Sequence, residues 1–111
     1  MTPAFEHRLA QLLLADDPVV ALARAVDDPA LEPELRAALI AVDPDGLRLS
    51  ALFIARLRFE RLLQGDAHAA EQFEADPEAF SAEFRLYHAE APPTAFFPQD
   101  EAALFQRWRA R

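Results

Sequence analysis

Residues Leu47 to Gly65 read LRLSALFIARLRFERLLQG and form the longest uninterrupted helical pattern in the chain. At about 100° per residue, six apolar side chains gather on one broad face: Leu49, Leu52, Phe53, Leu57, Phe59 and Leu63. Leu47, Ile54 and Leu62 fall elsewhere, so the helix is apolar over more than half of its circumference. This pattern predicts a central helix over residues 47–64 that neighbours cover on several sides.

Turn-forming residues bound this stretch on both sides. Asp43-Pro44-Asp45-Gly46 precedes it, and we expect Asp45 to accept the free amide hydrogens of the first turn. Gly65 stands where a left-handed C-terminal cap is favoured, and Asp66 follows as an N-cap for a new helix.

Outward from the central helix, the pair Asp-Pro recurs four times and separates short helical patterns. Asp is a good N-cap, and Pro lacks an amide hydrogen that would be unsatisfied in the first turn. Helices are expected over residues 3–15, 19–26, 34–42, 66–75, 78–89 and 99–109.

No segment alternates with period two, and the chain contains only two glycines. Pro92-Pro93 ends a helix, so residues 91–98 are expected to be extended. Adjacent side chains of an extended segment point to opposite faces, which suggests that one of Phe96 and Phe97 enters the core while the other faces a partner. The predicted fold is all-α: one domain over residues 1–111, a compact bundle of six or seven short helices.

The composition excludes several classes of function. The 19 acidic residues outnumber the 11 bases, all of them Arg, so the net charge is −8. This balance argues against nucleic acid and anionic membrane as partners. Cys is absent, which rules out disulfides and thiolate metal sites. The N-terminus has no signal-peptide pattern and no apolar run is long enough to span a membrane, so a cytoplasmic protein is expected.

Residue patterns typical of catalysis are not apparent. His7, His68 and His88 are scattered, with no HxxxH or HExxH pair, and no Gly-rich loop is present to bind phosphate. Ser50 and Ser81 lack the context of a nucleophile elbow. We therefore expect no catalytic, cofactor-binding or metal-binding residues and a chain that is not an enzyme by itself.

The central helix carries the only local excess of positive charge, with four Arg and one Glu over residues 47–65. Arg56 and Glu60 are four residues apart within its apolar face, where an ion pair at the edge of the core is the structural interpretation and a partner-facing pair the functional one. Arg58 and Arg61 point elsewhere, and solvent exposure is expected for both. Nine Phe, one Trp and one Tyr must mostly form the core, but aromatics and Arg are also common interface anchors.

Several stretches resemble a known family: Leu57 to Gly65, Tyr87-His88, Pro92-Pro93 through Pro98, and Glu101 to Trp108. Together they look like the small partner subunits encoded beside multinuclear non-haem iron oxidases of ribosomal-peptide modification, of the methanobactin and 3-thiaglutamate type. The resemblance covers residues 47–111.

The resemblance implies a heterodimer with a larger TIM-barrel enzyme that carries the iron and oxidises a peptide Cys. The small subunit would help to recruit or position the precursor peptide. Some such partners use a strand-bearing domain to bind the leader peptide; this sequence shows none, which favours a helical groove or a scaffolding role. The interface candidates are Arg56, Arg58, Phe59, Glu60, Arg61, Phe96, Phe97 and Trp108. An Arg58→Glu, Arg61→Glu double change is then expected to weaken the complex without unfolding the chain.

Two alternatives remain open at this point. One is a general helical adaptor or regulator with no link to an iron enzyme, which would co-purify with a different protein. The other is a homodimer that uses the aromatic C-terminal surface.

Overall fold

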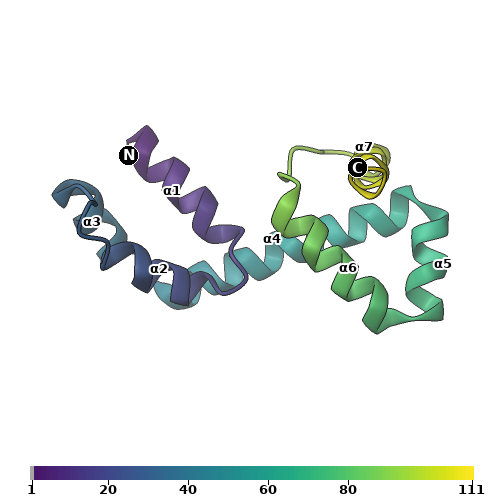
Figure 1. The fold of residues 1–111 in the computed structure, drawn as a ribbon, viewed down its shortest axis with the longest axis horizontal. Coiled ribbons are helices and arrows are strands. Elements are labelled where there is room, and N and C mark those ends of the chain that lie inside the picture. The colour runs from purple at the N-terminus through teal and green to yellow at the C-terminus, as the bar shows by residue number, and fades with distance from the viewer. Residues whose placement is uncertain (1) are drawn as a thin grey trace. The chain divides into compact units, whose positions relative to one another are not determined.

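The computed structural model describes residues 2–111, and over these residues the chain contains helices and no strands (Figure 1). The predicted all-α class is confirmed. Seven helices occur in the described residues: α1 (Pro3–Leu13), α2 (Pro18–Val26), α3 (Pro33–Ile40), α4 (Pro44–Gly65), α5 (Ala67–Ala75), α6 (Pro77–Glu90) and α7 (Pro98–Arg109). Each agrees with its expected range to within one helical turn.

Three of the four Asp-Pro pairs begin a helix. The side chain of Asp17 accepts hydrogen bonds from the amides of Val19 and Val20 at the start of α2, and that of Asp76 caps α6. Asp28 instead accepts from the amide of Ala30 in a turn between α2 and α3.

The start of α4 differs from the expectation. Asp43, not Asp45, receives the amide hydrogens of the first turn, from Asp45 at 3.2 Å and from Gly46 at 3.2 Å. The helix therefore begins at Pro44, because a Pro in the first position leaves no unsatisfied donor there.

Contacts divide the chain into two compact units, residues 1–53 and 54–111, and the boundary falls within α4. The expectation of a single domain stays a prediction. We call these the N-terminal and C-terminal units. The N-terminal unit packs α1, α2, α3 and the first part of α4 around a small aliphatic core: Leu12, Leu22, Ala25, Leu31, Leu39 and Leu47.

The C-terminal unit has an aromatic core. Its buried residues are Leu62, Ala69, Phe80, Phe84, Tyr87, Ala91 and Phe105. The rings meet edge to face, as in the contacts of Phe59 with Phe73 and Phe84, whose centroids lie 5.2 and 5.0 Å away. The buried residues of α6 are Phe80, Phe84 and Tyr87.

The buried face of α4 agrees only in part with the one that the apolar pattern indicates, since Phe59 and Leu63 pack against the aromatic core as expected. Leu47, Ala51, Arg58 and Leu62 are buried, whereas the expected core residues Leu49, Leu52 and Phe53 are 64, 64 and 62% exposed. A helical wheel that is apolar over more than half its circumference does not show which part meets the neighbouring helices. The buried part includes an Arg, which hydrophobicity alone assigns to solvent.

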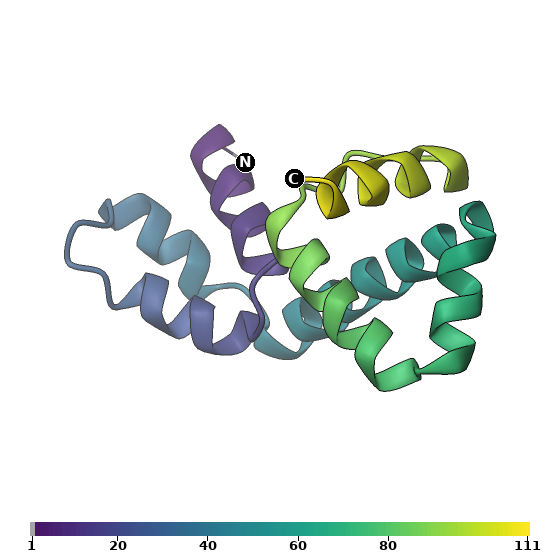
Figure 2. The same ribbon diagram turned by 45° about the vertical axis from the view of Figure 1, so that its right-hand side comes forward.

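Gly65 does not form a left-handed cap, because no glycine in residues 2–111 has a positive φ angle. It is the last residue of α4, and the chain passes close to it where α7 begins (Figure 2). A Cβ atom on Gly65 would lie 2.1 Å from the carbonyl oxygen of Pro98. A residue without a side chain is therefore required here for close approach of the two backbones.

We predict that Gly65→Ala lowers the free energy of unfolding by about 1–3 kcal/mol, because backbone must move to admit the methyl group. Urea denaturation followed by far-UV circular dichroism measures this. Gly46→Ala is the matched control: its Cβ would lie 3.2 Å from a side-chain oxygen of Asp43, which can shift more easily than backbone. Equal small effects of the two changes would contradict the close-approach explanation.

Candidate partner-binding surface

Residues 91–97 leave the helical conformation between α6 and α7. Pro92 and Pro93 cause this break, since neither can donate to the preceding turn. The first part of the segment is held by one buried side chain. Arg58 of α4 donates to the carbonyl oxygens of Ala91 at 2.7 Å and of Pro92 at 3.2 Å, which follow the end of α6.

Arg58 is itself held by a buried carboxylate. Its Nε donates to Oε2 of Glu101 in α7 at 2.9 Å, and the two residues are 1 and 0% exposed. The hydroxyl of Tyr87 in α6 donates to the same carboxylate oxygen. The Arg58 guanidinium carbon also lies 4.2 Å from the centroid of the Tyr87 ring. One buried network thus joins α4, α6, α7 and the segment after α6.

Two titratable groups at this network, Tyr87 and His88, have shifted pKa values. Burial, and then the hydrogen bond to Glu101, raise the pKa of Tyr87 well above its ordinary value, so the phenol keeps its proton. Burial, and then the charge of Arg58, lower the pKa of His88. The neutral ring of His88 accepts from Arg58 through Nδ1 at 3.2 Å, because a guanidinium group only donates.

The second part of the segment carries two exposed phenyl rings. Phe96 and Phe97 are 74 and 55% exposed, and their centroids lie 5.3 Å apart in a T-shaped contact. Neither enters the core, so the expectation that one would do so is wrong. The guanidinium carbon of Arg61 lies 5.8 Å from the Phe96 centroid. We call Arg61, Phe96 and Phe97 the aromatic patch.

The two Phe residues of the aromatic patch lie on a segment whose backbone is hydrogen-bonded at both ends. Upstream, Arg58 binds the carbonyls of Ala91 and Pro92. Downstream, the carbonyl of Phe97 accepts from the amides of Asp100 and Glu101 at the start of α7. Adjacent rings in this short, anchored stretch are thus presented together on the surface, although most of the chain's Phe residues are used in the core.

The remaining interface candidates lie elsewhere. Arg56 and Glu60 form the expected ion pair, with Nε and Oε1 3.4 Å apart, but both are exposed rather than at the edge of the core. Phe59 packs within the aromatic core. Trp108 also packs against that core, and its indole nitrogen is buried without a hydrogen-bond partner in residues 2–111.

Arg58 was expected to be exposed to solvent, and this expectation is wrong. It is buried in the network described above and is not available as surface. The Arg58→Glu, Arg61→Glu double change is therefore no longer expected to leave the fold intact. Its first change would bury a second carboxylate beside Glu101. Glu101 and Tyr87 are not among the candidates from the sequence, because no local spacing relates them to Arg58.

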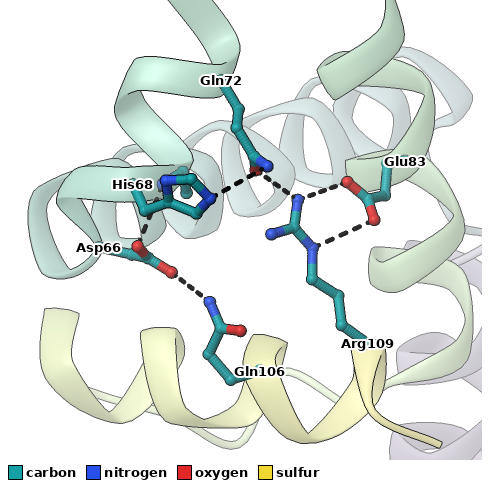
Figure 3. A network of polar contacts seen from close by, with 7 residues as sticks. Asp66, His68, Gln72, Glu83, Gln106 and Arg109 are labelled. Carbon is teal, nitrogen blue, oxygen red and sulfur yellow. Dashed lines mark hydrogen bonds and ion pairs between the residues drawn. The ribbon is translucent and has the colours of Figure 1, made fainter.

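A second polar network joins α5, α6 and α7 in the same unit (Figure 3). Arg109 forms two hydrogen bonds with the Glu83 carboxylate, at 3.1 and 2.6 Å, and a third with the side-chain oxygen of Gln72. Gln106 donates to Asp66 at 2.6 Å. These groups bind one another, which indicates a structural role in positioning α7.

Comparisons with protein-family models, curated proteins and solved structures give no match to this chain. Within residues 2–111, no group of three or more His, Asp or Glu side chains could hold a metal ion. No helix in this part of the chain is sufficiently long and apolar to cross a membrane.

We predict that Arg58→Met lowers the free energy of unfolding by about 3–5 kcal/mol, because Glu101 is left buried without its cation. Adding Glu101→Leu should recover part of this loss, but not the two hydrogen bonds to Ala91 and Pro92. Arg56→Met, which breaks an exposed pair, should change stability by less than about 1 kcal/mol. Denaturant unfolding of the three variants checks this, and a small effect of Arg58→Met would contradict the buried-network assignment.

We also predict that stability falls at mildly acidic pH through His88. Its folded-state pKa lies below the ordinary 6.5, so the stability it contributes is present above that pH and is lost as the pH falls towards the folded-state pKa. His88→Gln keeps an acceptor for Arg58 without titrating, and should reduce the loss of unfolding free energy between about pH 7 and pH 5. Leu86→Gln, at a 59% exposed position of the same helix, is the control, because it leaves His88 in place and should not change the profile.

Proposed function

We propose that this chain is a non-catalytic subunit that binds a larger protein through the aromatic patch. The observation that carries this proposal is the pair of adjacent, exposed Phe rings beside Arg61. Exposed aromatics rimmed by polar residues are typical of protein interfaces, where aromatic and Arg side chains supply much of the binding energy.

Charge supports the same choice of surface. Although acids outnumber bases in the chain, Arg61 is one of six Arg residues that form no ion pair with a carboxylate in residues 2–111, and it lies beside the exposed ring of Phe96. A cation left unpaired beside two apolar rings fits a partner surface with a carboxylate next to an apolar side chain.

The anchored backbone supports it further. Because Arg58 and the start of α7 fix both ends of the segment, the rings lose little conformational freedom when a partner binds. The proposed partner, from the resemblance of residues 47–111, is a TIM-barrel enzyme with a multinuclear iron centre that oxidises a Cys of a precursor peptide. In this role the chain helps to recruit or position that peptide.

The test is a pull-down of the tagged full chain from its native host, with iron measured in the eluate. We expect a stoichiometric, iron-containing larger subunit. Phe96→Ser, Phe97→Ser should reduce its recovery at least about tenfold, as expected for loss of interface anchors. Arg61→Glu should weaken recovery by charge repulsion. Each variant should retain the helicity of the unmodified chain, because the altered side chains lie outside the core.

Leu86→Ser is the matched control, because Leu86 is a 59% exposed apolar residue of α6 outside the aromatic patch. It should leave recovery unchanged. Full recovery with the double Phe variant would contradict the assigned surface. An eluate with a different, iron-free partner would contradict the iron-enzyme assignment and favour a general adaptor.

A further inference from the structure

The N-terminal unit contains a hollow of about 440 Å³ between α1 and α2. Asp28, which follows α2, lines it together with three residues of α1 and three of α2: Arg8, Gln11 and Leu12, then Ala21, Arg24 and Ala25. The hollow is large enough for an amino-acid side chain with part of its backbone.

The two Arg residues of the hollow differ from the other Arg residues of the N-terminal unit, because their side chains have no partner within residues 2–111. Residues 1–53 contain nine acids and four Arg. Arg36 donates to the carbonyls of Val26 and Asp28, and Arg48 pairs with Asp45. Arg8 and Arg24 form no hydrogen bond or ion pair through their side chains within residues 2–111. The two cations of the unit that remain free therefore line the same hollow, despite the excess of carboxylates.

Asp28 sets the charge that the hollow can accept. Its Oδ1 accepts a hydrogen bond from the amide of Ala30 at 2.9 Å in the turn after α2, and its carboxylate forms no ion pair with Arg8 or Arg24. With two Arg and one Asp, the lining carries one net positive charge. A single negative charge neutralises it, whereas a dianion would meet repulsion from Asp28.

The apolar part of the lining is formed by Leu12, Ala21 and Ala25, and the side-chain amide of Gln11, which also lines the hollow, is hydrogen-bonded to His7. The apolar part suits a short aliphatic stem that ends in a charged group. We propose that this hollow binds the carboxylate of a glutamate-type side chain from an acidic peptide segment, with Arg8 and Arg24 as the donors. The site lies in the N-terminal unit, so it is independent of the aromatic patch and goes beyond the proposed function.

The test uses the full chain and a blocked glutamate, N-acetylglutamate α-amide, as probe. Nuclear magnetic resonance of the Arg Nε–Hε groups should show saturable shifts at Arg8 and Arg24 as the probe is added. The neutral isostere, N-acetylglutamine amide, should cause none. Arg8→Gln and Arg24→Gln should each weaken probe binding at least about tenfold, because each removes a charge-assisted donor from the carboxylate.

Arg85→Gln is the matched control, since Arg85 is an exposed Arg of the C-terminal unit outside the hollow, and it should leave probe binding unchanged. Shifts that do not saturate, equal binding of the neutral amide, or unchanged binding in Arg8→Gln would overturn the proposal. Inorganic phosphate is the third probe, and tighter binding of phosphate than of the blocked glutamate would overturn the assignment to a carboxylate. Because the aromatic patch is unaltered in these variants, their pull-down result reports separately on the proposed function.

Discussion

The buried ion pair between Arg58 and Glu101 is the constraint on which the C-terminal unit depends. Neither charge could be buried alone, since an uncompensated ion in the interior costs several kcal/mol. The pair therefore fixes the approach of α7 to α4, and Tyr87 extends the same restriction to α6. A well-packed apolar pair could be equally stable, so we interpret this network as a determinant of arrangement more than of stability.

The same Arg determines what the surface presents. Its remaining donors bind the carbonyls of Ala91 and Pro92 after α6. The Ala91 carbonyl has no other donor in residues 2–111, whereas that of Pro92 also accepts from the amide of Thr94. The short segment from there to α7 leaves Phe96 and Phe97 outside the core while holding their backbone between fixed points. The buried Arg58–Glu101 pair and the exposed rings of Phe96 and Phe97 are thus connected through the backbone of one short segment.

Local signals in the sequence were sufficient for the secondary structure. Asp-Pro pairs and Pro92-Pro93 act through their own backbone neighbours, so the helix limits and the all-α class could be predicted. The buried face of α4 could be predicted only in part, because Leu49, Leu52 and Phe53 are at least as apolar as the buried Leu47, Ala51 and Leu62. That choice depends on what lies opposite α4.

In the candidate site, too, some residues could be predicted from the sequence and others could not. Arg61, Phe96 and Phe97 are interface candidates from the resemblance, and the structure brings them together. Arg58 was assigned to solvent because its carboxylate partner is 43 residues away, and no helical spacing relates the two. Gly65 was assigned to a cap because its neighbour Pro98 is likewise distant in sequence.

Hydrogen–deuterium exchange of the chain, free and bound to the partner that it captures, tests the central claim most directly. In the free chain the amides of Ala95, Phe96 and Phe97 donate to no acceptor in residues 2–111, so they should exchange rapidly. Our account predicts that binding slows exchange most strongly in the segment 94–99. Unchanged exchange there, with protection confined to α1, α2 or α3, would contradict it.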